Sequence, residues 1–275
     1  MPIPLLSPVS PRDLALILSD LEAGTPRQWF WLEIAATQPA SPPPSRLHPA
    51  AILLRRGGPA LVWPWLRQQK LPGLALYTRS MAPLWQRLAQ VAGDSALACT
   101  ALPALLAGFD RLPAIQLFTV WLLMLGGMAW QGWRAIRTAP PVGRDDTDLP
   151  GPEDSVGITG QLLAAGATAS EALALTAALR ADASRVWPAL QVRLPALAPG
   201  LPGRGLCGML SMLAWLAASL PMLLALSWLP APWGLPAGII LCAAVAAGGK
   251  GRLAGGFVLL AGLLAFALGR LGHVL

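Results

Sequence analysis

Apolar residues run almost without interruption through the last quarter of the chain. Residues 206–275 contain no acidic side chain and only three basic ones, Lys250, Arg252 and Arg270. A soluble domain needs polar residues to cover its outside, and this stretch has almost none. Its apolar segments lie at 206–229, 234–248 and 253–271. We therefore expect three membrane helices, of which the middle one is short for a bilayer core of about 30 Å.

A further apolar region lies in the middle of the chain. Residues 113–133 are uncharged and long enough to span a bilayer, and Trp130 and Trp133 fall where an interfacial aromatic belt is expected. Residues 95–109 are also uncharged but number only fifteen, and Asp110-Arg111 follows them. If 113–133 crosses alone, residues 1–110 lie outside the cytoplasm. If 95–109 crosses too, as half of a helical hairpin, residues 1–110 lie inside, and the chain has five transmembrane helices rather than four.

The N-terminal hundred residues have the periodicity of short helices. Leu14, Ile17 and Leu18 share one helical face, Gly24 offers a turn, and Thr25-Pro26 is typical of a helix start. A Pro/Ser linker at 38–49 is followed by expected helices at 50–56, 60–69 and 74–92.

These patterns predict an all-α polytopic membrane protein with small cytoplasmic helical bundles and about four to five transmembrane helices. The expected parts are an N-terminal helical bundle at 1–94, a membrane helix or helical hairpin at 95–136, a cytoplasmic linker and helical hairpin at 137–205, and C-terminal membrane helices at 206–275.

Two stretches of the chain are similar to each other. Residues 20–36 read DLEAGTPRQWFWLEIAA, and residues 162–178 read LLAAGATASEALALTAA. Each predicts a helix, a turn at Gly24 or Gly166, a helix-start residue and a second apolar helix. The alternative is a chance match, since Ala-Gly and Ala-Ala pairs are common in an Ala/Leu-rich chain.

The second stretch resembles a known family. Leu162 to Gly166, followed by Ser170-Glu171-Ala172-Leu173, is similar to the opening of the cytoplasmic bundle in type II secretion F and type IV pilus inner-membrane platform proteins. Residues 57–92 resemble the later helices of a first copy. The chain departs from the family in its shorter second bundle and in three apolar segments at the C-terminus, where the family usually has one.

The resemblance implies a scaffold rather than an enzyme. It suggests a platform subunit of a secretion or pilus-like assembly machine, with the lipid bilayer, other membrane subunits and a cytoplasmic assembly ATPase as partners. It also implies the bacterial inner membrane, which agrees with the Ala/Leu/Pro/Gly/Arg-rich composition. The alternatives are a transporter or permease subunit, supported by the short and glycine-rich segments, and an intramembrane enzyme, for which no set of catalytic residues is visible.

Charge adds information about topology. The chain is 55% hydrophobic and 12% charged with net charge +7, and we interpret the basic excess as topology control rather than nucleic-acid binding. Arginines at 134, 137, 144, 185, 193 and 204 place 137–205 in the cytoplasm. Lys250 and Arg252 return the chain to that side, which leaves His273 outside.

No residue set predicts a catalytic, metal or cofactor site. Gln116 and Ser211, within expected spans, are typical of hydrogen bonds between helices. His48 and His273 have no carboxylate or cysteine near them in the sequence, and Cys99, Cys207 and Cys242 are far apart. The aspartates at 145, 146 and 148 are assigned to a linker, and Gly248-Gly249-Lys250 to a tight turn. The remaining candidate is a basic face for an acidic partner, formed by Arg55, Arg56, Arg67 and Lys70.

Overall fold

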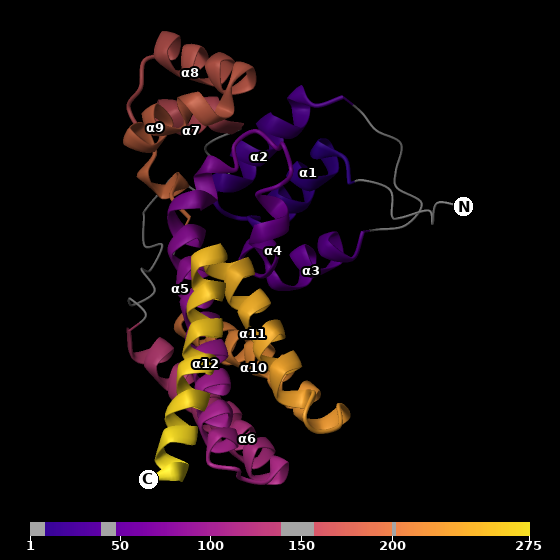
Figure 1. Ribbon diagram of the computed structural model, residues 1–275. Coiled ribbons are helices and arrows are strands. Elements are labelled where there is room, and N and C mark those ends of the chain that lie inside the picture. The colour runs from indigo at the N-terminus through magenta and orange to yellow at the C-terminus, as the bar shows by residue number, and fades with distance from the viewer. Residues whose placement is uncertain (1–8, 40–47, 139–156, 200–201) are drawn as a thin grey trace, which may run out of the picture. The chain divides into compact units, whose positions relative to one another are not determined.

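The computed structural model describes residues 9–39, 48–138, 157–199 and 202–275. Within these ranges all regular structure is helical (Figure 1). The chain forms two compact units, each built from two separate stretches of sequence. Unit 1 comprises Met1–Ala82 and Gly143–Leu201, and unit 2 comprises Pro83–Val142 and Pro202–Leu275. The all-α membrane fold expected from the sequence is confirmed.

Unit 1 consists of short helices. Its first stretch forms α1 (Pro11–Leu21), α2 (Pro26–Thr37), α3 (Pro49–Gly57), α4 (Pro59–Leu66) and the beginning of α5 (Ala75–Gly108). Its second stretch forms α7 (Gly157–Ala164), α8 (Ala169–Ala181), α9 (Ala183–Arg193) and the 3-10 turn η1 (Pro195–Leu197). Apart from α5 these helices have at most 13 residues, about 20 Å, which is too short to cross a bilayer core of about 30 Å.

The two stretches of unit 1 pack together. Helix α2 contacts α7, α8 and η1, and Arg180 of α8 forms an ion pair of 2.8 Å with Glu33 of α2. Packed segments must lie on the same side of a membrane. An even number of crossings therefore separates them, so α5 and α6 either cross the bilayer together or do not cross at all.

Helix α5 corrects one expectation from the sequence. The segments expected at 74–92 and 95–109 form one continuous helix of 34 residues, about 51 Å long. The intervening Asp94 does not end the helix, since one Asp costs a helix interior less than about 1 kcal/mol; its carboxylate lies 3.7 Å from the Lys250 ammonium. The apolar segment at 95–109 is too short to span a bilayer by itself, but it continues a helix that is longer than a bilayer core is thick.

Unit 2 contains the long apolar helices. These are the remainder of α5, α6 (Pro113–Thr138), α10 (Arg204–Trp228), α11 (Gly234–Lys250) and α12 (Arg252–Val274). Helices α5, α6, α10 and α12 are long and apolar enough to cross a membrane. Helix α11 has 17 residues, about 26 Å, and so reaches most of the way across a bilayer core.

Glycines allow the helices of unit 2 to approach closely. A Cβ atom on Gly255 would lie 2.8 Å from the Ala243 carbonyl oxygen, and one on Gly234 would lie 2.9 Å from that of Ala225. On Gly269 it would overlap the carbonyl oxygen of Leu105 in α5. The Gly- and Ala-rich α12 is therefore suited to backbone contact with its neighbours, as its composition predicts.

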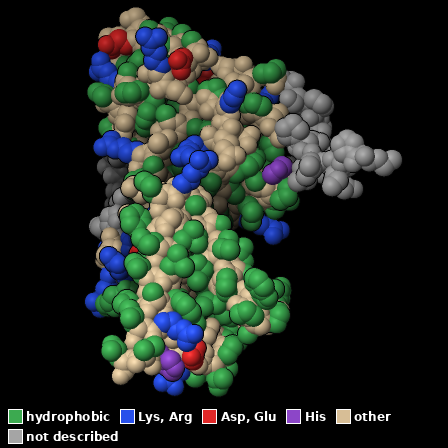
Figure 2. All heavy atoms as spheres, viewed as in Figure 1, with side chains coloured by type: hydrophobic (Ala, Val, Ile, Leu, Met, Phe, Trp, Pro, Cys, Tyr) green, Lys and Arg blue, Asp and Glu red, His purple; other side chains and the backbone are tan. Residues whose placement is uncertain are grey.

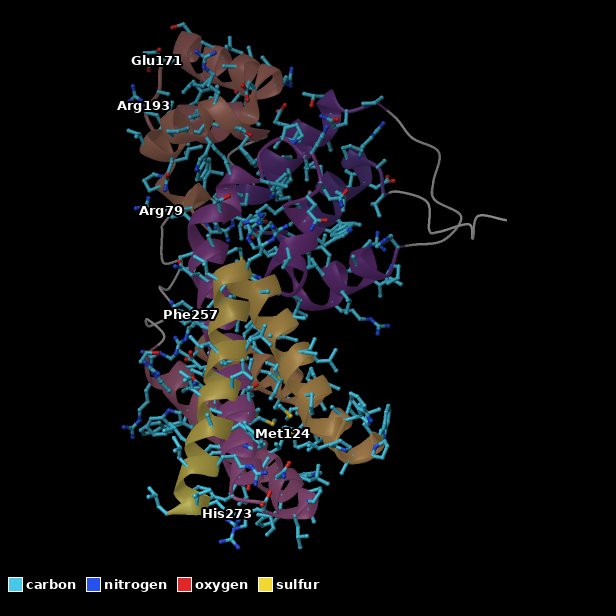
Figure 3. The ribbon with its side chains drawn as sticks, viewed as in Figure 1. Arg79, Met124, Glu171, Arg193, Phe257 and His273 are labelled. Atoms are coloured by element: carbon cyan, nitrogen blue, oxygen red, sulfur yellow. The ribbon has the colours of Figure 1, made fainter. Side chains whose placement is uncertain are left out.

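The outer surface of unit 2 is apolar. Large hydrophobic side chains point outward from α6 and α12, including Phe118, Leu122, Phe257 and Leu263. Hydrophobic side chains are spread over the visible face of α11 and α12 (Figure 2), and Phe257, which is 68% exposed, lies on α12 (Figure 3). Such a surface is stable in hydrocarbon and unstable in water.

Candidate functional site

A buried polar network lies inside unit 1. The Arg27 guanidinium of α2 is 6% exposed and donates to the Glu22 carboxylate at 2.9 Å. The second oxygen of Glu22 accepts a hydrogen bond of 2.7 Å from the Tyr77 hydroxyl. The Trp31 indole N–H donates to that hydroxyl at 3.2 Å, and the two rings are stacked. A charged group is rarely buried unless it is paired in this way.

The network also reaches the second stretch of unit 1. The guanidinium of Arg27 donates to the carbonyl oxygens of Ala196 and Ala198 at 3.1 and 3.2 Å. Ala196 lies within η1 and Ala198 is the residue that follows it, shortly before the chain enters α10. Tyr77 lies in the first turn of α5. One arginine–glutamate pair thus fixes the segments of unit 1 that lead into two membrane helices.

This network was not predicted from the sequence. Arg27 follows a proline at a helix start, where a solvated side chain is the usual expectation, and its carbonyl partners are far away in sequence. The one available signal was the position of Tyr77, the chain's sole tyrosine, at the beginning of an apolar helix.

The predicted hairpin turns at Gly24 and Gly166 are both present. The two glycines have φ of +81° and +85°, a conformation that glycine adopts without steric cost. After α7, the Gly166 N–H donates to the Leu163 carbonyl and the Ala167 N–H donates to the Leu162 carbonyl. Such bonds are a common way to end a helix. Both turns thus use glycine in the same left-handed conformation.

The helices after these turns begin differently. Thr168 and Glu171 form a reciprocal capping box at the start of α8. Thr25 occupies the corresponding position of α2, but its hydroxyl donates backwards to the Glu22 carbonyl at 2.8 Å and makes no cap. Glu171 also pairs with Arg193, in the last turn of α9, at 3.0 Å (Figure 3). The shared feature is therefore the glycine turn, and the capping expected at both sites is confirmed only at Thr168.

The four basic residues of the predicted docking face fall into two pairs. Arg55 and Arg56 occupy the last turn of α3. Arg67 is the residue after α4, and Lys70 lies three residues further on, in the segment between α4 and α5. All four are exposed. The eight residues of α4, about 12 Å of helix, separate the pairs along the chain.

The polar residues of the membrane helices correct a second expectation. Gln116 donates to the Arg111 carbonyl, and Ser211 to the Cys207 carbonyl, so each bonds within its own stretch of chain and not to another helix. Other residues make the bonds between helices. The Ser95 hydroxyl donates to the Trp215 carbonyl at 2.9 Å, and the Trp215 indole donates to the Leu123 carbonyl at 3.0 Å.

Both histidines have partners that the sequence does not show. His48 caps α3 by accepting the Ala50 N–H at 3.1 Å, and it stacks on Trp65. His273 lies 3.5 Å from Asp110, contrary to the expectation that no carboxylate is near. Asp110 also pairs with Arg270 at 2.9 Å, so these residues join the α5–α6 turn to the end of α12.

The remaining candidates have simpler positions. The turn expected at Gly248-Gly249-Lys250 is found one residue later, at Gly251, where φ is +92° and α11 gives way to α12. Cys99, Cys207 and Cys242 are unpaired and buried. The aspartates at 145, 146 and 148, with Arg144, lie outside the described residues.

These features define a class: a multi-pass membrane protein whose extramembrane unit is assembled from two separate stretches and locked by a buried ion pair. Comparisons with protein-family models, curated proteins and solved structures find no match for the chain. The argument for a function therefore rests on the chain's own residues.

Proposed function

We propose that the protein is an inner-membrane platform subunit of a secretion or type IV pilus-like assembly machine. The observation that supports this most is the packing of two helical hairpins, each turned by a left-handed glycine, into one unit that enters the membrane through α5 and α10. A scaffold needs such a body, held at more than one point and able to bind subunits on its surface.

The bonding in the membrane helices supports a structural role. The buried Ser95 and Ser211 hydroxyls of unit 2 donate to backbone carbonyls, and glycines bring helix backbones into contact. These interactions hold helices together. A transporter is expected to place polar groups and irregular backbone around a solute site near the bilayer centre.

The distribution of basic residues favours a cytoplasmic unit 1. Five cations lie at one end of the unit 2 helices, at the end of α6, the start of α10 and the α11–α12 turn: Arg134, Arg137, Arg204, Lys250 and Arg252. The other end has Arg111 and Arg270, the latter paired with Asp110. Cytoplasmic loops carry an excess of Lys and Arg. With five crossings, the C-terminus lies on the opposite face from unit 1.

The exposed side of α8 offers a position for testing partners. Leu173 is 62% exposed and projects from α8 next to exposed alanines. A photo-crosslinking amino acid at this position, introduced in the source cell, should form an adduct with a cytoplasmic assembly ATPase or another inner-membrane subunit of the same machine. Asp20, exposed on α1, provides a control position.

A deletion strain completes this test. Loss of the protein should abolish pilus assembly or secretion, and the full chain should restore it. If assembly and secretion persist, and purified protein in liposomes instead conducts a solute, the transporter alternative replaces the scaffold.

A further inference from the structure

Helix α3 carries an unusual outer face. Ala51 and Leu54 are fully buried, whereas Ile52 and Leu53 are 39% and 51% exposed. At 100° per residue, the outer positions follow one another around the helix in the order Arg55, Ile52, Arg56 and Leu53. We call these four residues the α3 face. Large aliphatic side chains and guanidinium groups therefore alternate on one exposed surface.

Neighbouring residues hold this face in place. His48 caps the first turn of α3 through its ring nitrogen and stacks on Trp65 of α4. Gly58, with φ of +72°, ends the helix directly after the arginines. The exposure of Ile52 and Leu53 is thus a property of a folded helix that is fixed at both ends.

The arginines of the α3 face differ from three other arginines of unit 1. Arg27, Arg180 and Arg193 each pair with a glutamate. No ion pair joins Arg55 or Arg56 to a carboxylate among residues 9–39, 48–138 and 157–199. Their charge is available to an external anion, and Arg67 and Lys70 add positive charge at the far end of α4.

Two covalent connections keep unit 1 close to the bilayer. Its first stretch continues within α5 into a membrane helix, and its second stretch ends immediately before α10. Unit 1 is therefore tethered to the bilayer at two points of the chain. Exposed aliphatic groups mixed with Arg are the composition of helices that lie in the interface of an anionic leaflet.

We propose that the α3 face docks on the anionic headgroups of the adjacent leaflet. Arg55 and Arg56 contact lipid phosphates while Ile52 and Leu53 enter the boundary between headgroups and acyl chains. This contact would fix the orientation of unit 1 above the membrane. It does not depend on the proposed function and applies equally to a scaffold or a transporter.

The test uses full-length protein in nanodiscs, with Cys99, Cys207 and Cys242 replaced by alanine. A polarity-sensitive fluorophore is attached at Ile52→Cys, in discs of phosphatidylcholine alone or mixed with phosphatidylglycerol, and nitroxide-labelled lipid reports proximity to the bilayer. Val192→Cys on α9, 80% exposed in the same unit, is the control that the proposal leaves in water.

The proposal predicts blue-shifted emission and quenching by nitroxide lipid at position 52 only when phosphatidylglycerol is present. One cation near an anionic surface contributes roughly a fivefold factor, so Arg55→Gln with Arg56→Gln should lower the docked-to-undocked ratio about 25-fold. Arg185→Gln with Arg193→Gln, which removes the same charge from α9, should leave the signal unchanged. Raising the salt from about 0.1 M to about 1 M, which shortens the screening length from about 10 Å to about 3 Å, should also weaken docking.

Three results would overturn the proposal. Position 52 could be as accessible to water as position 192 in anionic discs. Its shielding could be the same with and without phosphatidylglycerol, which would identify a protein contact and not a lipid contact. Both double-arginine variants could lower the signal equally, which would indicate a general charge effect. Circular dichroism and limited proteolysis of each variant establish that it is folded.

Discussion

Replacement of Arg27 by methionine should loosen the junction between the two stretches of unit 1. The substitution keeps most of the side-chain volume but removes the donors to Glu22 and to the carbonyls of Ala196 and Ala198. Glu22, with a side chain only 15% exposed, keeps the Tyr77 hydroxyl as a partner. Breaking a buried ion pair from one side typically costs about 3–5 kcal/mol. Because Glu22 keeps that bond, we expect about 3 kcal/mol.

A double-mutant cycle separates the pair from its surroundings. Glu22→Gln should cost about 2–3 kcal/mol, because it removes the carboxylate charge that pairs with the buried guanidinium. The combined variant should cost less than the sum of the single changes, with a coupling energy of about 1–3 kcal/mol. Arg180→Met is the matched control. The Arg180 side chain, which pairs with Glu33, is more than half exposed, and exposed ion pairs contribute about 1 kcal/mol or less.

Native-state hydrogen exchange of the full chain in detergent measures these effects by segment. Arg27→Met should lower the opening free energy of amides in α9 and η1 as well as in α2, while amides of α10 keep their protection. The reasoning is wrong if Arg27→Met costs no more than Arg180→Met, or if exchange in α9 and η1 does not change.

Three further predictions test other parts of the fold. Gly269→Ala should destabilise unit 2 by about 1–3 kcal/mol in chemical unfolding, because its Cβ overlaps a carbonyl oxygen of α5, whereas Gly256→Ala, with no atom within 4 Å, should be neutral; equal effects would contradict the close approach. Thr168→Ala should weaken α8 by about 1 kcal/mol in hydrogen exchange, and Thr25→Ala should leave α2 largely unaffected since its hydroxyl makes no cap. Ser95→Ala removes a bond between helices and should cost about 0.6–1.7 kcal/mol in the same unfolding assay, and no loss would show that the bond contributes nothing to stability.

The sequence predicted the features of this protein that depend on local patterns. Continuous apolar runs located the membrane helices, and the two Ala-Gly turns were placed correctly because a left-handed residue after a helix strongly favours glycine. The turn at Asp110-Arg111 was also recognised, since two charged residues are costly within a span.

Features that depend on distant partners could not be read from the sequence. The sequence predicted separate segments at 74–92 and 95–109, although α5 continues through Asp94, whose charge is matched by Lys250 from another helix. Distant partners also explain three other features: the bonds of Ser95 and Trp215, the contact of His273 with Asp110, and the burial of Arg27. In each case the partner lies more than a hundred residues away or on another helix, and no periodicity within one segment reveals it.

The separate domains expected at 1–94 and 137–205 illustrate the same limit. The apolar periodicity of each stretch predicts helices but does not show which distant helices they pack against. The structure groups most of both stretches in unit 1, and this grouping places them on one side of the bilayer. Packing, and not hydropathy, thus shows that the two stretches share one side of the bilayer.

The central claim is that α5 and α6 form a membrane hairpin between two packed stretches of one extramembrane unit. Cysteines introduced singly at four exposed positions, Asp20, Arg111, Val192 and Leu275, can be tested with a membrane-impermeant maleimide in intact and permeabilised cells. The account predicts that positions 20 and 192 react only after permeabilisation and that positions 111 and 275 react in intact cells. Opposite sidedness of positions 20 and 192, or reaction of position 111 together with them, would contradict it.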